Sequence, residues 1–205
     1  MTADYTLCLV ADRGLLAGEA LLPAVEQAIL GGCTVVQFRQ KAGGRFLQQA
    51  AAVQRVTDRY NIPLIVNDRT DAALALGAAG VHVGQRDMPA AAARRILGPD
   101  MLLGVSVASV PEAVRAVEDG ADYLGVGAMF PTGTKADASL VSMAELARIR
   151  RAVSVPIVVI GGLCAENAGA FRPLGVSGAA AASAILTQPD VRGAAARLKA
   201  AFLGR

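Results

Sequence analysis

Eight short apolar runs alternate with eight amphipathic stretches along the chain, and this alternation restricts the folds that the chain can adopt. The apolar runs, which we expect to be strands, span residues 6–12, 35–40, 63–68, 80–84, 102–107, 123–128, 156–162 and 178–183. The amphipathic stretches, which we expect to be helices, span residues 19–30, 45–60, 71–78, 89–97, 111–119, 142–152, 165–171 and 190–203. Strands that alternate with helices form a parallel sheet, and eight such units close most naturally into a barrel. We therefore predict an α/β fold, a (β/α)8 TIM barrel that forms one domain over residues 1–205.

Two other outcomes stay open at this point. An open, doubly wound parallel sheet has the same alternation, although no G-x-G-x-x-G follows the first run to support a dinucleotide-binding version. The last run, GAAAAS at 178–183, is so rich in alanine that periodicity alone does not separate a strand from a helix. It is therefore the weakest of the eight predicted strands.

Composition argues against several classes of partner. The net charge is only +3 and aromatic residues make up 4% of the chain, whereas nucleic-acid-binding proteins use basic patches and aromatic stacking. No apolar run approaches the roughly 18 residues of a membrane span, and the N-terminal segment lacks the basic start of a signal peptide. Cys8, Cys33 and Cys164 are too few and too scattered for a disulfide framework or a zinc site. We expect a cytoplasmic protein without nucleic-acid or membrane partners, and a homo-oligomer stays open.

Polar residues gather at the C-terminal ends of the expected strands, and the N-terminal ends show no such clustering in the sequence. TIM-barrel enzymes place their active sites at the C-terminal ends of the strands. The candidate site residues are Gln37, Arg39, Lys41, Asn67, Asp68, His82, Asp87, Ser106, Thr132, Gly133, Thr134, Lys135, Gly162, Ala182 and Ser183. Their one-sided distribution predicts an active-site mouth at this end of the barrel.

The loops after the last two expected strands are suited to one phosphate group. Gly161 and Gly162 end the seventh strand and let backbone N–H groups approach an anion, and Ser183 ends the eighth strand. Loops at these two positions are a common phosphate site in TIM barrels. The sequence therefore predicts that a phosphate monoester binds there.

A second anion site is predicted where cations and acids occur together. Three cations and two acids lie at or just after the C-terminal ends of expected strands: Arg39, Lys41, Lys135, Asp68 and Asp87. Carboxylates beside phosphate-binding cations are typical of a Mg²⁺ site, because Mg²⁺ is held by one or two carboxylates, substrate phosphates and waters. We therefore predict a diphosphate substrate with Mg²⁺ at this part of the mouth.

Each of these residues also has a structural interpretation. Arg39 and Lys41 could be surface charges at a strand end, although burial without a partner would be costly. Asn67 and Asp68 could form a turn and a cap of the helix that follows them, and Asp87 could likewise cap the next helix. His82, the only histidine, could be a hydrogen-bonded core imidazole or a contact to the substrate.

Six motifs, in order along nearly the whole chain, resemble those of the thiamine phosphate synthase family. They are QFRQK at 37–41, VND at 66–68, GVHVGQ-x-D at 80–87, GVS at 104–106, FPTGTK at 130–135 and IGG at 160–162. The resemblance implies a (β/α)8 barrel that uses Mg²⁺. It also implies a transferase that condenses 4-amino-2-methyl-5-(diphosphooxymethyl)pyrimidine with hydroxyethylthiazole phosphate or its carboxylate form, releasing thiamine phosphate and diphosphate.

The resemblance also implies roles for the candidate residues. The pyrimidine diphosphate would contact Gln37, Arg39, Lys41, Asn67, His82, Ser106 and Lys135, of which Arg39, Lys41, Ser106 and Lys135 would be catalytic. The thiazole phosphate would contact Thr132, Gly133, Thr134, Gly162, Ala182 and Ser183, and the Mg²⁺ carboxylates would be Asp68 and Asp87. The expected mechanism is dissociative: the bond to diphosphate breaks first, and the thiazole nitrogen then attacks the pyrimidine methyl cation.

The sequence departs from the family pattern at two positions. Arg69 and Arg86 stand beside the predicted metal ligands, where an acidic residue is common in the synthases. The related thiazole tautomerases are the main alternative, but they use a histidine after the fifth strand, where this chain has Ala108, and tend to lack an acid that matches Asp87. A non-catalytic barrel that binds a phosphorylated ligand is the third possibility.

Overall fold

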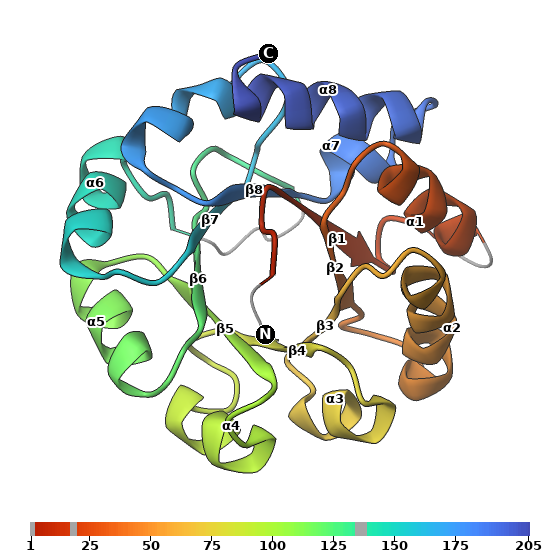
Figure 1. Cartoon of the computed structure of the whole chain (residues 1–205), viewed down its shortest axis with the longest axis horizontal. Coiled ribbons are helices and arrows are strands. Elements are labelled where there is room, and N and C mark those ends of the chain that lie inside the picture. Colours follow the sequence, from red (N-terminus) through yellow and green to blue (C-terminus); the bar gives the residue numbers. More distant parts are fainter. Residues whose placement is uncertain (1–2, 17–19, 134–138) are drawn as a thin grey trace.

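A closed barrel of eight parallel strands forms the centre of the molecule in the computed structural model, which describes residues 3–16, 20–133 and 139–205 (Figure 1). The strands are β1 (Leu7–Asp12), β2 (Val35–Arg39), β3 (Leu64–Asn67), β4 (Gly80–Val83), β5 (Leu102–Val107), β6 (Tyr123–Val126), β7 (Ile157–Ile160) and β8 (Gly178–Ala181). Each strand pairs in parallel with the next, and β8 pairs with β1 to close the ring. The predicted (β/α)8 barrel is confirmed, and the open sheet is excluded.

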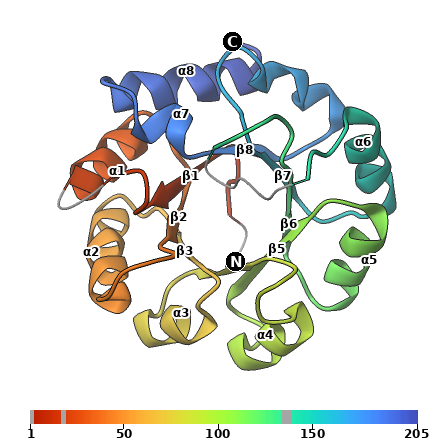
Figure 2. The same cartoon turned by 180° about the vertical axis from the view of Figure 1, so that it is seen from behind.

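The described helices surround the strands, as views along the barrel axis from opposite ends show (Figures 1 and 2). They are α1 (Leu21–Leu30), α2 (Phe46–Arg59), α3 (Thr70–Leu76), α4 (Ala90–Leu97), α5 (Val110–Glu118), α6 (Met143–Ala152), α7 (Ser183–Leu186) and α8 (Val191–Leu203). None of the helices in the described part of the chain is both long and apolar enough to span a membrane.

The segment after β7 differs from the prediction. In place of a helix over 165–171, the chain forms two 3₁₀ turns, Ala168–Ala170 and Arg172–Leu174. Gly169 lowers helix propensity, and Pro173 cannot donate a helical hydrogen bond. The alanine-rich run after it is a strand as predicted, and the short helix α7 follows β8 directly.

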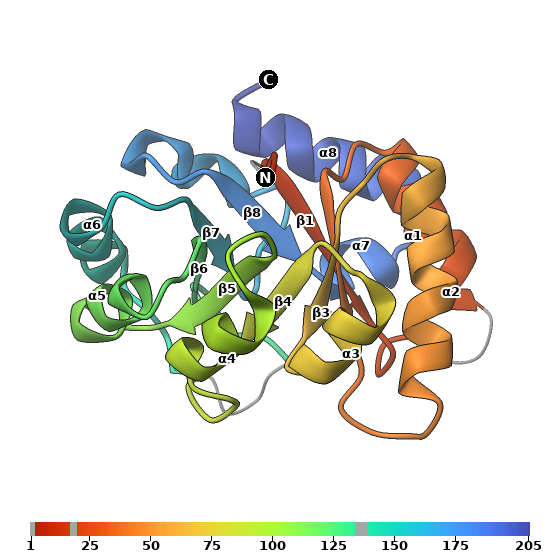
Figure 3. The same ribbon diagram turned by 60° about the horizontal axis from the view of Figure 1, so that its bottom comes forward.

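The two faces of each strand are buried in different places, and β2 shows this most clearly. Val36 and Phe38 are fully buried and belong to the core between strands and helices. Val35 belongs to a second core inside the barrel, while Gln37 and Arg39 on the same face are only partly buried. Figure 3 shows the strands inclined within the ring of helices. The interior face of β2 therefore passes from apolar packing to polar side chains along the strand.

Apolar and aromatic side chains fill the N-terminal part of the barrel interior. This core consists of Tyr5, Cys8, Val10, Val35, Ile65, Leu102, Tyr123, Val158 and Ala180. The rings of Tyr5 and Tyr123 lie 4.7 Å apart between centroids. Because the chain before β1 packs onto this end, the interior is closed there and can open only toward the C-terminal ends of the strands.

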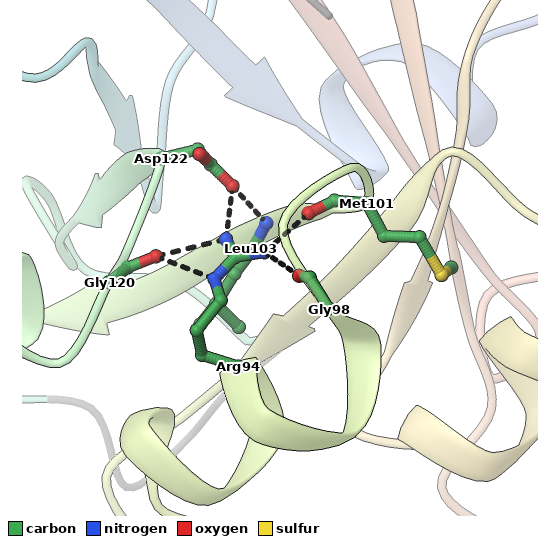
Figure 4. A network of polar contacts seen from close by, with 6 residues as sticks. All are labelled: Arg94, Gly98, Met101, Leu103, Gly120 and Asp122. Atoms are coloured by element: carbon green, nitrogen blue, oxygen red, sulfur yellow. Dashed lines mark hydrogen bonds and ion pairs between the residues drawn. The ribbon is translucent and has the colours of Figure 1, made fainter.

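A polar cluster lies at the N-terminal ends of β5 and β6 (Figure 4), and its charged residues, Arg94 and Asp122, stand outside the runs that were predicted as strands. The Arg94 guanidinium donates to the carbonyl oxygens of Gly98, Met101 and Gly120 at 2.7, 2.8 and 2.9 Å. It also forms an ion pair with Asp122, whose carboxylate accepts from the backbone N–H of Leu103 at 2.7 Å. The cluster joins the loops that precede the two strands, which indicates a structural role.

Candidate active site

One pocket at the C-terminal ends of the strands brings most of the predicted site residues together. Its lining includes Gln37, Arg39, Lys41, Asn67, Asp68, His82, Asp87, Ser106, Thr132, Gly162, Ala182 and Ser183. Gly133 is exposed and is not part of this lining, and the predicted residues Thr134 and Lys135 lie outside the described residues. The pocket therefore unites both predicted anion sites at one mouth.

Arg39 is held by a carboxylate that sequence reasoning missed. Asp12 ends β1 beside Arg39 on β2, and the two side chains form an ion pair. Asp12 is only 3% exposed, and its other carboxylate oxygen accepts from the backbone N–H of Gly14 at 2.8 Å. Its position as the last residue of the first predicted strand was the available signal. Asp12 therefore holds the guanidinium of Arg39 in place, and the Arg39 side chain still lines the pocket.

Lys41 and Asp68 form a second ion pair across the mouth. Asp68 has a left-handed backbone (φ 64°), and its N–H donates to the carbonyl oxygen of His82 at 2.8 Å. Burial raises the pKa of Asp68, as does the neighbouring Asp87 carboxylate, while the Lys41 ammonium lowers it. The net effect is a raised pKa of Asp68. Because Asp87 contributes to this shift, the two carboxylates lie close enough to repel each other.

Asp87 does not cap helix α4, which begins after Pro89 without a side-chain cap. Its carboxylate instead accepts from the backbone N–H of Gly84 at 2.8 Å and lies in the loop after β4. Among the described residues, no cluster of three or more His, Cys, Asp or Glu side chains could hold a metal ion by itself. Two neighbouring carboxylates in a pocket with cations nevertheless fit Mg²⁺, because this ion completes its coordination shell with substrate phosphates and waters.

His82 lies inside the barrel at the floor of the pocket and is 8% exposed. Its Nδ1 lies 3.0 Å from the Tyr123 hydroxyl, and its Nε2 lies 2.9 Å from the Ser106 hydroxyl. Two strand glycines make this arrangement possible: a Cβ at Gly104 would lie 2.4 Å from Nδ1, and one at Gly125 would lie 2.9 Å from Cε1. The imidazole is therefore hydrogen-bonded in the core and also forms part of the pocket surface.

Close packing requires a glycine at position 162 after β7, in addition to its predicted role in binding. Gly162 has a positive φ of 65°, and a Cβ there would lie 2.6 Å from the Cβ of Phe130 and 2.7 Å from the carbonyl oxygen of Pro131. The side chain of Asn167 donates to the Gly162 carbonyl oxygen at 3.0 Å. These contacts hold the β6 and β7 loops together at the mouth, where Thr132 and Ser183 contribute hydroxyl groups.

A comparison with protein families matches residues 7–185 to thiamine monophosphate synthase, over most of the barrel just described. The chain belongs to the thiamine monophosphate synthase family.

Relatives within this family cover almost the whole chain. The thiamine-phosphate synthase of Clostridium beijerinckii is 52% identical over 202 residues, which is 98% of this chain and 97% of that protein. The thiamine-phosphate synthase of Ruminiclostridium cellulolyticum is also 52% identical, over 204 residues and the same shares of both chains. Among solved structures, the thiamine phosphate pyrophosphorylase of Pyrococcus furiosus is 35% identical, with a TM-score of 0.89 and coverage of 98% of this chain and 97% of that one.

Sequence reasoning identified the mouth of this thiamine monophosphate synthase family member but missed Tyr123 as well as Asp12. Tyr123 stands at the start of β6, away from the polar ends of the strands, so its position suggested only core packing. The signal was the pair of glycines at positions 104 and 125, because a glycine inside a strand often marks a close approach by another group.

Proposed function

We propose that the chain joins 4-amino-2-methyl-5-(diphosphooxymethyl)pyrimidine to hydroxyethylthiazole phosphate or its carboxylate form. The products would be thiamine phosphate and inorganic diphosphate. The names of the curated relatives favour this synthase activity over the thiazole tautomerase and over a barrel that only binds ligand. We also propose a cytoplasmic location, which the three free cysteines suit because disulfides are rare in that compartment.

The observation that carries the proposal is the order of the strands around one pocket. The cations Arg39 and Lys41 and the carboxylates Asp68 and Asp87 come from β2, β3 and β4 and the loops that follow them. The glycine loop at Gly162 and the hydroxyl groups of Thr132 and Ser183 follow β6, β7 and β8, so we assign them to a second end of the pocket. A diphosphate with a divalent cation suits the first end, and a single phosphate suits the second.

The proposed chemistry needs charge stabilisation and positioning more than a strong base. The bond between the pyrimidine methylene carbon and the diphosphate oxygen breaks, and its electron pair leaves with the diphosphate. Arg39 and Lys41 neutralise the charge that develops on this leaving group, a role that Lys135 would share. The ring amino group stabilises the resulting cation, and the lone pair of the thiazole nitrogen forms the new C–N bond.

The neutral polar residues would orient the two rings for this step. Gln37, Asn67 and Ser106 line the same pocket and would hydrogen-bond the pyrimidine. Thr132, Gly162, Ala182 and Ser183 would hold the thiazole phosphate, with Gly133 and Thr134 from the same loop. Holding the two substrates in line converts a bimolecular reaction into an effectively unimolecular one.

Asp68 and Asp87 would hold Mg²⁺ in this site, since their two carboxylates fit the ion's preference for oxygen ligands. When bound together with the diphosphate, Mg²⁺ supplies positive charge that stabilises the leaving group. The ion pair with Lys41 keeps the Asp68 carboxylate oriented toward the same end of the pocket.

The direct test is to incubate the purified protein with both phosphorylated substrates and to measure thiamine phosphate and diphosphate. We expect equal amounts of the two products, and we expect EDTA to stop the reaction until Mg²⁺ is restored. A protein that forms no thiamine phosphate contradicts the proposal. Aromatisation of the non-aromatic thiazole carboxylate alone would identify a tautomerase, and binding of the substrates without conversion would identify a non-catalytic barrel.

A further inference from the structure

Three polar side chains, those of Tyr123, His82 and Ser106, form a continuous line at the floor of the pocket. The Tyr123 hydroxyl lies 3.0 Å from Nδ1 of His82. On the other side of the ring, Nε2 of His82 lies 2.9 Å from the Ser106 hydroxyl. Ser106, at one end of the line, faces the pocket.

The line is tightly enclosed, so its members have little freedom to change partners. His82 is 8% exposed and Tyr123 is 4% exposed. The absence of side chains at Gly104 and Gly125 leaves just enough space for the two rings, as a Cβ at Gly104 would lie 2.2 Å from Cζ of Tyr123. A buried network of this kind is costly unless every member is hydrogen-bonded, so its geometry is closely specified.

The donors and acceptors can be assigned from the two hydroxyl groups that contact the ring. A phenol O–H is more acidic than a serine O–H and is the stronger hydrogen-bond donor, so the Tyr123 O–H is directed to Nδ1 of His82, which accepts. A neutral imidazole that accepts at Nδ1 carries its proton on Nε2, so Nε2–H donates to the Ser106 oxygen.

We propose that Tyr123 and His82 are positioning residues that fix Ser106 as a hydrogen-bond donor toward the bound pyrimidine. The Ser106 oxygen accepts from Nε2–H of His82, which leaves its own O–H to turn into the pocket. The site would recognise a ring nitrogen that accepts a hydrogen bond.

This inference rests on the proposed function for the identity of the ligand, but its first test does not. His82 is the only histidine, so tag-free protein with ¹⁵N-labelled imidazole gives one pair of ring-nitrogen signals by NMR. At neutral pH we expect a neutral ring with its proton on Nε2. A proton on Nδ1, or a doubly protonated ring, would overturn the assignment, whether or not the protein makes thiamine phosphate.

The second test uses a matched pair of tyrosine variants. Tyr123→Phe keeps the ring and removes the O–H that Nδ1 accepts, so we expect a mixture of imidazole tautomers and a fall of about tenfold in kcat/KM for the pyrimidine diphosphate. The KM for the thiazole phosphate should not change. Tyr5→Phe makes the same change on the ring 4.7 Å away, outside the line, and should leave both substrates within about twofold of wild type.

The outcomes separate this inference from the proposed function. Tyr123→Phe kinetics equal to wild type would overturn the positioning role, whatever the state of the ring. An equal loss in Tyr5→Phe and Tyr123→Phe would also overturn it, because the effect would then come from packing. Failure of the proposed function would instead be visible in the wild-type protein, as an absence of thiamine phosphate.

Discussion

Arg39 shows how this fold prepares a single cation for an anionic ligand. The strand places the side chain at the mouth, and the buried Asp12 carboxylate on the neighbouring strand holds the guanidinium in one orientation. A guanidinium has five N–H donors, so pairing with one carboxylate leaves donors for a phosphate. We therefore expect the ion pair to order Arg39 before the proposed substrate binds.

Replacing Asp12 tests this interpretation. Asp12→Asn removes the charge that orients Arg39, so the KM for the pyrimidine diphosphate should rise about tenfold, because the substrate must then order the guanidinium. The free energy of unfolding should fall by about 2 kcal/mol with the loss of a charged hydrogen bond. Steady-state kinetics and urea unfolding measure the two effects. Asp58→Asn, on the exposed surface of α2, is the control and should change neither; a normal KM in Asp12→Asn would contradict the role.

Asp68 is expected to reduce the stability of the unliganded protein. Its pKa is raised by burial and by Asp87, so the folded state favours the protonated carboxyl. The stability that the protonated carboxyl contributes is fully present below about pH 4, which is the pKa of an aspartate in the unfolded chain. It is lost as the pH rises through the higher pKa of Asp68 in the folded protein. Asp68→Asn should therefore raise the free energy of unfolding at neutral pH without Mg²⁺, and asparagine also tolerates the left-handed backbone at this position.

Unfolding measured as a function of pH checks this prediction, and the difference from wild type should close as the pH falls below about 4. Asp71→Asn provides a control of opposite sign, because a hydrogen bond from Arg69 lowers the pKa of Asp71. That variant should gain no stability at neutral pH. An Asp68→Asn protein that is less stable than wild type at neutral pH would show that the ion pair with Lys41 outweighs burial and the Asp87 charge.

At the scale of strands and helices, the sequence was sufficient to predict those elements in which burial determines the spacing of apolar residues. Alternation in 35–41 was sufficient to place Val36 and Phe38 under the helices and Gln37 and Arg39 on the interior face. The segment 165–171 was predicted wrongly because local features decide its structure. The side chain of Asn167 accepts a hydrogen bond from the backbone N–H of Cys164 and donates one to the carbonyl oxygen of Gly162, and Pro173 lies in the second 3₁₀ turn.

The Arg94 cluster gives a prediction at the same scale. The guanidinium satisfies three carbonyl oxygens around the starts of β5 and β6, and a lysine ammonium cannot reach all of them from one position (Figure 4). Arg94→Lys should lower the free energy of unfolding by about 2–3 kcal/mol, measured in urea, with kcat unchanged in the folded protein. Arg95→Lys, on an exposed position of the same helix, is the matched control. Equal stability of the two variants would argue against a structural role for the cluster.

The whole barrel explains why the mouth was predictable and the contacts within it were not. Parallel strands have their C-terminal ends at the same edge, so polar strand ends had to meet once the barrel closed. The pairs Asp12–Arg39 and Lys41–Asp68 each join residues 27 positions apart, at or just after the C-terminal ends of neighbouring strands. Their formation depends on strand register and on side-chain direction, which the alternation of polar and apolar residues does not specify.

We propose that the one pocket has two ends, a charged end for the diphosphate and a glycine–hydroxyl end for the thiazole phosphate. Calorimetric titration of each ligand, inorganic diphosphate with Mg²⁺ and thiazole phosphate, into Lys41→Gln and Ser183→Ala tests this division most directly. We predict that Lys41→Gln weakens diphosphate binding about tenfold and Ser183→Ala weakens thiazole phosphate binding about fivefold, with the other ligand within about twofold of wild type in each case. Equal weakening of both ligands in either variant, or the reverse pattern, would contradict the account.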